Sequence, residues 1–521
     1  MSRSIVLKSL IGFLGIGTIV IIILQLTAKK EVEEFLRNKI PQHIQLDYEK
    51  ISANILTGSV LIEELNITVA NRRDTLVHTR VKADYLEIEG LNHWHFLFDK
   101  TFDINSLIIR RPMVKYFSDN KSKRSENDTL GVVKLLKTIM IDQIEIENGS
   151  FYILKGAVDS LLLESHQINF TLNEFKTDPN IIKRKIPFEH EAYTFSANDS
   201  FVDLDSFETL KIKSINVQNN NVAINDIQLK SKYKKEDSSK HLERERDHVT
   251  LEIPKLDIGG LGFGFSLNKF YLLSDEIVFT SPKLEVFRDK RLADDTVDKK
   301  MYSKLIKNLP IDIKVPKIEF TEAHVGYEEQ INDHGIPGRL FIDHINASIL
   351  GLDTKAAKGD STQLKVKGLL VGNAPISLDY MFDVTNEYDE FLVKGRVSSL
   401  QAAELNSFLR PNLNVEAEGN VDEMYFTISG DSHTSSGDMK MRYENFRFDL
   451  LRKDGKRVDK ILTAIGNLFV NNGEKNNDDG FRFGEIKAER NIDKSFFNYL
   501  WLGIKSGIVS TLTGDGKKEK K

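Results

Sequence analysis

Five ten-residue segments of the chain repeat one pattern of apolar and polar positions. Positions 1, 3, 8 and 10 are apolar, and position 6 is a turn-prone or small residue. The segments are LIIRRPMVKY from Leu107, IEIENGSFYI from Ile144, INVQNNNVAI from Ile215, IVFTSPKLEV from Ile277 and IEFTEAHVGY from Ile318. Alternation with a period of two is typical of a β-strand with one apolar and one solvated face.

The spacing from position 3 to position 8 is odd, so a straight strand would place the two apolar pairs on opposite faces. A two-residue turn at positions 5 and 6 would pair position 3 with 8 and position 1 with 10, which returns all four to one face. We therefore predict hairpins, with turns such as Asn148-Gly149 and Asn219-Asn220. Arg111-Pro112 and Ser281-Pro282 predict a bend or bulge instead. Ordinary hairpins of a β-sandwich are the alternative interpretation.

A larger repeat joins these segments. The first and second are separated by a charged stretch and the short helical pattern KLLK at 134–137, and the fourth and fifth by a charged stretch and KLIK at 304–307. This order predicts an internal duplication at about residues 84–155 and 255–329. Duplicated units of this kind extend a structure by stacking, without one globular core.

Short alternating runs dominate residues 42–451 and predict a mainly β body. Clear examples are the runs at 364–366, 376–384, 391–397 and 439–450. Lys, Glu and Asp occupy the intervening positions, as expected when one face of a sheet is solvated.

The N-terminus carries one long apolar run. Residues 10–26 are uncharged over 17 residues, and extension back to Ile5 gives 22 residues, or roughly 33 Å of helix. Residues 1–27 are therefore predicted to form a short cytoplasmic tail and a transmembrane anchor, with a cleaved signal peptide as the alternative. Residues 28–41 predict a juxtamembrane helix. The predicted anchor residues are Leu10, Phe13, Leu14, Ile19, Ile21, Ile23 and Leu26.

Residues 452–521 change to a helical pattern. Apolar residues recur at helical spacing over 458–469 and 496–512, and Ser495 is a predicted N-cap. The sequence then reads GDGKKEKK. The last helix is expected to cap the edge of the sheet, or alternatively to lie in a membrane interface.

Composition and motifs exclude several classes of function. The net charge of −5 and the pI of about 6.2 come without a basic stripe, so no nucleic-acid partner is expected. The chain has no cysteine, which rules out disulfides and thiol nucleophiles. His93 and His95 lack a second pair for a metal, and GGLGFGF from Gly259 predicts a bend or close approach in a sheet instead of a nucleotide site. No enzyme, metal site or cofactor is predicted.

Four motifs, taken in order, resemble a known family. They are the strand pattern at 57–67 (TGSVLIEELNI), INSLIIRRPMVKY from Ile104, the strands from Gly419 to Leu450, and RNIDKSFFNYLWLGIKSGIVSTL from Arg490. Their order resembles the AsmA-like family of bacterial envelope proteins, which is related to TamB, YhdP and the bridge-like lipid transfer proteins.

The resemblance implies a mainly β fold: an elongated, curled, mostly antiparallel repeating sheet with a hydrophobic groove, one N-terminal transmembrane helix and C-terminal helices. Residues 42–451 would form the AsmA-like β-groove body, and 452–521 a C-terminal helical cap and basic tail. The implied location is the bacterial inner membrane, single-pass, with the bulk of the chain in the periplasm. The implied partner is a phospholipid or other acyl-chain lipid, in phospholipid transport or outer-membrane homeostasis. An outer-membrane or periplasmic protein is a further candidate partner, and no catalytic residue is carried over.

The size of the predicted sheet also agrees with a lipid-binding face. About 25 strands at ~4.8 Å make a sheet of roughly 120 Å, and an apolar face of that length stays exposed only if it binds something. Acyl chains would gain ~0.8 kcal/mol per buried methylene there. An envelope scaffold that pairs strands with outer-membrane proteins is the alternative function. The predicted groove-lining residues are Leu107, Ile109, Val114, Tyr116, Ile144, Ile146, Phe151, Ile153, Ile277, Phe279, Leu284, Val286, Ile318, Phe320, Val325 and Tyr327.

Overall fold

The computed structural model describes residues 43–54, 58–71, 74–91, 101–120, 138–156, 160–333, 335–451 and 479–513. Of these residues, 64% lie in strands and 11% in helices, so the mainly β class is confirmed. The chain divides into two compact units, Met1–Gln228 and Leu229–Lys521.

The described part of the first unit consists of strands and one short 3-10 helix. Its strands are β1 (Ile44–Asp47), β2 (Lys50–Asn54), β3 (Ser59–Ala70), β4 (Val77–Glu89), β5 (Thr101–Arg110), β6 (Met113–Phe117), β7 (Thr138–Lys155), β8 (Ser160–Thr177), β9 (Tyr193–Asp203), β10 (Glu208–Gln218) and β11 (Asn221–Ser231), which contains the boundary. The helix η2 (Ile181–Lys183) buries Ile181.

The second unit combines strands with helices. Its strands are β12 (His248–Gly259), β13 (Gly262–Ser266), β14 (Lys269–Leu273), β15 (Glu276–Thr280), β16 (Lys283–Asp289), β17 (Asp312–Gln330), β18 (Gly338–Asp353), β19 (Thr362–Leu370), β20 (Ala374–Phe382), β21 (Phe391–Gln401), β22 (Val415–Gly430), β23 (Thr434–Leu450) and β24 (Arg482–Glu489). Its helices are η3 (Ser238–His241), α4 (Tyr302–Lys307), η4 (Ala402–Leu405), α5 (Asn406–Leu413) and α6 (Phe496–Thr513). The strands predicted at 364–366, 376–384, 391–397 and 439–450 fall on β19, β20, β21 and β23.

The same strand arrangement occurs once in each unit. In the first, β4 is antiparallel to β5 and β6, both of these are parallel to β7, and β7 is antiparallel to β8. In the second, β12, β15, β16, β17 and β18 repeat this arrangement. Parallel strands need a crossover connection. In the second unit that crossover contains α4, where the pattern at 304–307 predicted a helix.

One left-handed residue at position 5 brings the apolar positions of a segment to one face. The five φ values are 48° at Arg111, 51° at Asn148, 52° at Asn219, 50° at Ser281 and 51° at Glu322. An extra residue in a strand moves all following side chains to the other face. In four of the five segments, the odd spacing between positions 3 and 8 is therefore resolved without a reversal of the chain.

The bend predicted for the two proline segments is confirmed, but most of the predicted hairpins are wrong. β5 and β6 are separated at Arg111-Pro112, and β15 and β16 at Ser281-Pro282. The segments from Ile144 and Ile318 lie inside the continuous strands β7 and β17, where bulges shift the register. The bulge is stabilised because an asparagine of the next strand accepts the free amide hydrogen: in the first unit, Asn148 N donates to Asn169 Oδ1 at 2.9 Å.

The segment from Ile215 is the one that turns back as a hairpin. Asn225 Nδ2 donates to Ser214 Oγ at 2.9 Å, a contact that a continuous strand could not make because eleven residues would separate the two by roughly 35 Å. β10 therefore lies beside β11, and the Asn219-Asn220 turn is confirmed.

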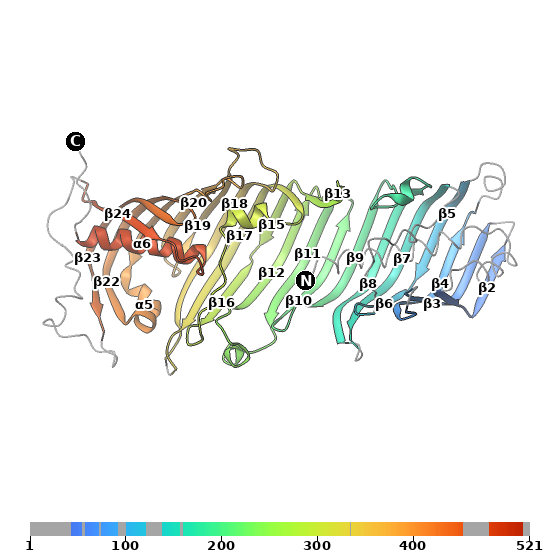
Figure 1. The fold of residues 1–521 in the computed structure, drawn as a ribbon, viewed down its shortest axis with the longest axis horizontal. Helices are drawn as coiled ribbons and strands as arrows, with labels where there is room; N and C mark the ends of the chain where they lie inside the picture. Colours follow the sequence, from blue (N-terminus) through green and yellow to red (C-terminus); the bar gives the residue numbers. More distant parts are fainter. Residues whose placement is uncertain are drawn as a thin grey trace. The chain divides into compact units, whose positions relative to one another are not determined.

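The last helix caps the final strand. α6 begins after Ser495, whose Oγ accepts from Asn498 N at 3.3 Å, so the predicted N-cap is confirmed. Ser510 Oγ accepts from Glu485 N at 2.9 Å and Ser506 Oγ from Lys487 N at 2.8 Å. These two amides of β24 would otherwise template another strand. α6 lies across the strands near β22 and β23 (Figure 1), and β24 itself was not expected from the helical pattern.

Several predicted elements lie outside the described residues. They are the anchor with Leu10 to Leu26, the juxtamembrane helix at 28–41, the short helix at 134–137 and the helical pattern at 458–469. Within the described ranges, no helix combines the length and the apolarity that a membrane crossing requires.

Candidate functional site: an apolar face of the second unit

The sixteen residues predicted to line a groove form eight side-by-side pairs across parallel strands. In the first unit the pairs are Leu107 with Ile144, Ile109 with Ile146, Val114 with Phe151, and Tyr116 with Ile153. In the second unit they are Ile277 with Ile318, Phe279 with Phe320, Leu284 with Val325, and Val286 with Tyr327. In each unit, two of the ten-residue segments therefore lie side by side, with position 1 beside position 1, 3 beside 3, 8 beside 8 and 10 beside 10.

The two sets differ in exposure. In the first unit, Ile144 is half-buried and the other seven residues are buried, with Ile153 at 0% and Phe151 at 7% exposed. They belong to a cluster of buried side chains contributed by strands from β2 to β9. In the second unit, Ile318 is buried at 9% and the other seven residues are half-buried. The accessible apolar surface among the sixteen residues therefore lies on the second unit.

Two apolar lanes cross the strands of the second unit on this face. Each lane consists of residues that are direct cross-strand partners. Lane 1 is Ile258, Ile277, Ile318, Ile349, Leu364, Tyr380, Val393, Ile428, Gly437 and Ile486. Lane 2 is Leu256, Phe279, Phe320, Ala347, Val366, Leu378, Gly395, Phe426, Met439 and Gly484. The rings of Phe279 and Phe320 stack at 4.8 Å between centroids.

The lanes are covered at one end and accessible at the other. Val393 and Ile486 are 0% exposed and Ile428 is 1% exposed, because α6 packs on this end of the lanes: Gly503 lies against Ile428 and Ile486, and Phe496 and Tyr499 belong to the same buried cluster. From β12 to β20 the lane residues are half-buried, except for Ile318 and the buried Tyr380 that ends lane 1. We call this half-buried part the open stretch. Its continuation through β18, β19 and β20 was not among the predicted lining residues.

The opposite face of the same strands is charged. Lys255 pairs with Asp257 at 2.8 Å, and Lys317 pairs with Glu276 at 2.8 Å and with Glu319 at 2.7 Å. These pairs alternate along β12, β15 and β17 with the lane residues. The sheet of the second unit is therefore amphipathic, and its apolar side has the chemistry to bind an apolar ligand.

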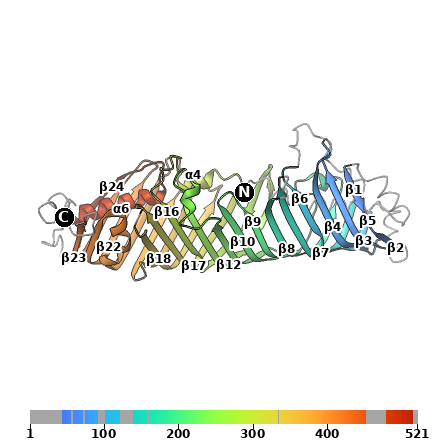
Figure 2. The same ribbon diagram turned by 90° about the horizontal axis from the view of Figure 1, so that it is seen from below.

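The crossover between β16 and β17, residues 290–311, lies on the apolar side and is here called the strap. The ring of Tyr302 in α4 lies 5.8 Å from Phe496 of α6 and 6.4 Å from Tyr380 of lane 1. Figure 2 shows α4 and α6 on the same side of the strands. At the start of α4, Ser303 Oγ donates to the buried Asp389 at 2.6 Å, and Lys304 pairs with the same carboxylate at 2.7 Å.

An ionic cluster joins the strap to the segment before α6. Glu245 is 5% exposed and pairs with Lys290 at 2.7 Å and Lys494 at 3.1 Å. Lys494 also pairs with Asp294 at 2.9 Å, and Lys299 N donates to Ile492 O at 2.8 Å. Burial opposes ionisation of Glu245, but hydrogen bonds from Lys290 and Lys494 outweigh burial and lower its pKa below 4.5.

Glu245→Gln is expected to loosen the strap and α6, since it leaves Lys494 with one anionic partner. We expect a loss of ~2 kcal/mol in the free energy of unfolding at neutral pH, because breaking a largely buried ion cluster leaves uncompensated charge. The lowered pKa means that the folded state binds the proton more weakly. The stabilisation is therefore present above pH 4.5 and lost as the pH falls below it. Thermal unfolding across pH checks this, with the exposed Glu387→Gln as control. An unchanged acid slope in Glu245→Gln would contradict it.

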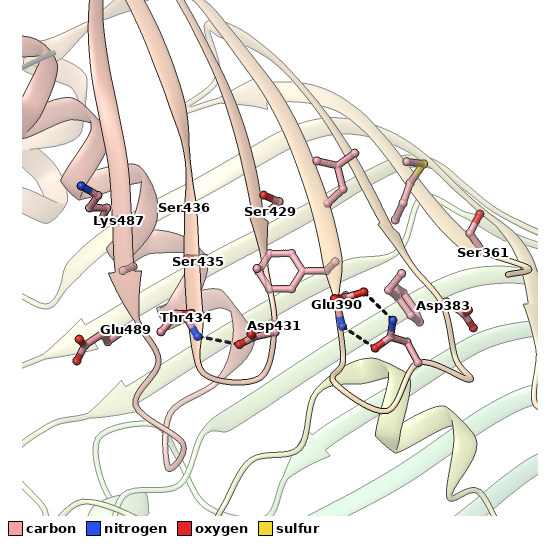
Figure 3. A pocket seen from close by; sticks show the side chains of 17 residues that line it. Ser361, Asp383, Glu390, Ser429, Asp431, Thr434, Ser435, Ser436, Lys487 and Glu489 are labelled. Atoms are coloured by element: carbon pink, nitrogen blue, oxygen red, sulfur yellow. Dashed lines mark hydrogen bonds between the residues drawn. The ribbon is translucent and has the colours of Figure 1, made fainter. Parts of the chain in front are cut away.

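A hollow of about 970 Å³, lined by polar and apolar residues in similar measure, lies at the ends of β20 to β24 (Figure 3). Two of its carboxylates, Asp431 and Glu390, are engaged in turns. Asp431 Oδ1 accepts from His433 N at 2.6 Å and Thr434 N at 2.9 Å, and Glu390 Oε2 accepts from Asn386 Nδ2 at 2.9 Å. Their hydrogen bonds to neighbouring turn residues explain these acidic groups without a ligand.

His324 and His344 of the second unit pair with carboxylates. His324 lies between Asp343 and Glu285, with Nε2 at 3.1 Å from Glu285, and His344 Nδ1 pairs with Glu322 at 2.7 Å. His93 and His95 lie outside the described residues. Among the residues that the structure describes, His, Cys, Asp and Glu form no group of three or more suited to a metal ion. The bend predicted at GGLGFGF is confirmed by a φ of 64° at Gly260.

The fold and the site define the chain as a mainly β protein whose second unit presents an accessible apolar face. Compared with known proteins, the chain matches no protein-family model and no curated protein sequence.

Proposed function

We propose that the chain is a membrane-tethered lipid-binding or lipid-transfer protein of the AsmA-like type. The observation that carries the proposal is the open stretch, where half-buried aliphatic and aromatic residues continue from strand to strand. A soluble surface of this kind is costly unless a ligand covers it. In this proposal, the sheet is elongated and curled, and its apolar side is a groove for acyl chains.

The dimensions of the open stretch suit an acyl chain. From β12 to β20 there are five steps between neighbouring strands, or roughly 24 Å at ~4.8 Å per step. The acyl chains of one membrane leaflet span about 15 Å, half of the hydrocarbon core. Each methylene buried on the lanes contributes ~0.8 kcal/mol, so a phospholipid would bind through its chains without a head-group site.

The location belongs to the same proposal. The apolar run at 10–26 would anchor the chain once in the bacterial inner membrane, and the two units would lie in the periplasm. The role would be phospholipid transport or outer-membrane homeostasis, with an outer-membrane or periplasmic protein as a partner. The competing role, a scaffold that pairs its edge with other strands, is disfavoured at β24, because Ser506 and Ser510 occupy two of its edge amides.

A matched pair of variants tests the apolar face. Phe279 is in lane 2, whereas Val278 next to it lies on the charged face beside Glu319, and both are half-buried. We expect Phe279→Asn to reduce the lipid bound to the purified full chain by about tenfold, because a large part of a Phe contact is worth ~1.5 kcal/mol or more. Val278→Asn is expected to retain the lipid. Mass spectrometry of co-purifying lipid, and photo-crosslinking to a lipid probe, measure the difference.

Two results would reject the proposal. One is the absence of lipid from the purified wild-type chain together with failure to crosslink an acyl-chain probe. The other is an equal loss in Phe279→Asn and Val278→Asn, since binding that depends equally on both faces cannot come from the lanes. Circular dichroism on both variants establishes that each is folded.

A further inference from the structure

The β13–β14 hairpin presents apolar side chains to solvent. Leu267 at its tip is 100% exposed, and Phe263 is 41% exposed. Phe265 and Phe270 are direct cross-strand partners, with ring centroids 5.3 Å apart. None of these residues belongs to either buried hydrophobic cluster of the described chain. Single exposed apolar residues are ordinary, but a group on one projecting element indicates a binding surface.

The tip projects beyond the strand that supports the hairpin. β14 runs parallel to β17, and their pairing begins with Tyr271 beside Asp312, the first residue of β17. The residues before Tyr271 therefore extend past the start of β17 by roughly 10 Å, at ~3.3 Å per residue. This extension carries Leu267 and the Phe265–Phe270 pair.

Folding does not account for a leucine at the tip. Leu267 has a φ of 46° and Asn268 a φ of 68°, the geometry of a two-residue hairpin turn that favours Asn, Gly and Asp. A non-glycine residue in the left-handed region is strained, most of all when its side chain cannot hydrogen-bond to the backbone. Leu267 is therefore unfavourable in both conformation and exposure, and strained residues tend to cluster at functional sites such as ligand-binding regions.

Near the tip of the hairpin the exposed charges are lysines, whereas the exposed Asp275 lies at its base. Lys269 and Lys355 both pair with Asp312, and the lysine side chains are 41% and 62% exposed whereas Asp312 is 7% exposed. Lys314, opposite Leu273, is 63% exposed, and its partner Asp353 is 24% exposed. The carboxylates are turned inward and the ammonium groups face solvent, an arrangement that complements an anionic surface.

We propose that the tip of the β13–β14 hairpin inserts into the surface of a lipid bilayer that contains anionic head groups. Leu267, Phe265 and Phe270 enter the boundary between head groups and acyl chains, and Lys269 and Lys355 lie at the level of the phosphates. The projection of roughly 10 Å agrees with the 5–10 Å depth at which interfacial segments bind. This inference is independent of whether lipid occupies the lanes.

The duplicated arrangement offers a parallel in sequence. The hairpin occupies the connection between β12 and β15, and the corresponding connection between β4 and β5 includes residues 92–100, which read NHWHFLFDK. Both connections are rich in aromatic residues and contain a lysine. Trp, Phe and Leu are typical of the apolar side of segments that lie in a membrane interface.

The test uses the absence of native cysteine. Asn268→Cys in the full chain, held in an amphipathic polymer, is labelled with an environment-sensitive fluorophore, which leaves Leu267 in place. Vesicles of phosphatidylcholine with a minority of phosphatidylglycerol are added, with and without brominated acyl chains. We expect a blue shift and bromine quenching at position 268, and neither at Asn373→Cys, in the exposed turn between β19 and β20.

A second variant separates binding from folding. Leu267→Asn relieves the turn strain, so its thermal midpoint should not fall, yet it should weaken the vesicle-dependent signal about tenfold through loss of a buried leucine. No quenching at position 268 would overturn the proposal, as would equal quenching at 373 or an unchanged signal in Leu267→Asn. A shift that depends on protein concentration without vesicles would indicate a second copy of the chain and would also overturn it.

Discussion

Phe151→Asp is expected to destabilise the first unit strongly, whereas Val325→Asp is expected to leave the second unit nearly as stable as in the wild-type protein. Both residues occupy position 8 of equivalent segments, in β7 and β17, and each lies beside an apolar partner, Val114 and Leu284 respectively. Their surroundings differ. Phe151 is 7% exposed in a closed cluster, whereas Val325 is half-buried on the open side of its sheet.

The physical reason is the cost of burying a charge without a partner. At Phe151, the loss of a large apolar side chain and the burial of a carboxylate are together worth on the order of 5 kcal/mol or more. For a unit of about 200 residues, this corresponds to a fall of roughly 10–20 °C in Tm. At Val325 the carboxylate reaches water and the cost is ~1 kcal/mol. Thermal unfolding followed by circular dichroism measures both; similar falls in the two variants would refute the difference between the faces.

Gly484→Ala is expected to displace α6 from the sheet. A Cβ at Gly484 would lie 2.6 Å from Gly507 O and 2.7 Å from Thr511 N, and both are backbone atoms of α6 that cannot rotate away. The helix would have to shift as a body, and it would lose its packing on Ile428 and Ile486, beneath Gly503. Overpacking of this kind costs ~3 kcal/mol.

Limited proteolysis and thermal unfolding follow the displacement of α6. Gly484→Ala should be cleaved faster within 490–513 than the wild-type protein, and its Tm should fall by roughly 6–12 °C. Gly262→Ala is the matched strand control, because the nearest atom to its Cβ is 3.7 Å away, an ordinary contact. If both variants behave like the wild-type protein, α6 does not pack against β24 closely enough to exclude a Cβ at Gly484.

The sequence identified the faces of the strands better than their connections. The apolar positions 1, 3, 8 and 10 do share a face, but the structure achieves this with a single left-handed residue, such as Asn148 or Glu322, in place of a hairpin. A hairpin and a bulge would each return positions 8 and 10 to the face of positions 1 and 3, so the apolar pattern alone could not distinguish the two structures. β5 and β6 pair with β7 in parallel because the chain between them crosses over. The apolar periodicity of the strands does not show whether their neighbours are parallel or antiparallel.

Exposure was the property that the pattern could not supply. Ile153 and Tyr327 are equivalent in sequence, but Ile153 is 0% exposed and Tyr327 is half-buried. Whether a face is closed depends on what packs over it, and that packing comes from residues distant in sequence, such as those of η2 and α6. The prediction of a cap at α6 succeeded because a helical period and the N-cap Ser495 are local signals.

The left-handed residue at position 5 restores, within each ten-residue segment, the alternation of side chains between the two faces of the sheet. Because every segment corrects its own alternation, adding or deleting a whole segment would not invert the strands that follow, whereas inserting one residue elsewhere would invert them. The number of segments can therefore change by duplication without redesign of the neighbouring sequence. In engineering terms, the length of such a sheet is an adjustable parameter, and the natural step for changing it is the whole segment with its crossover.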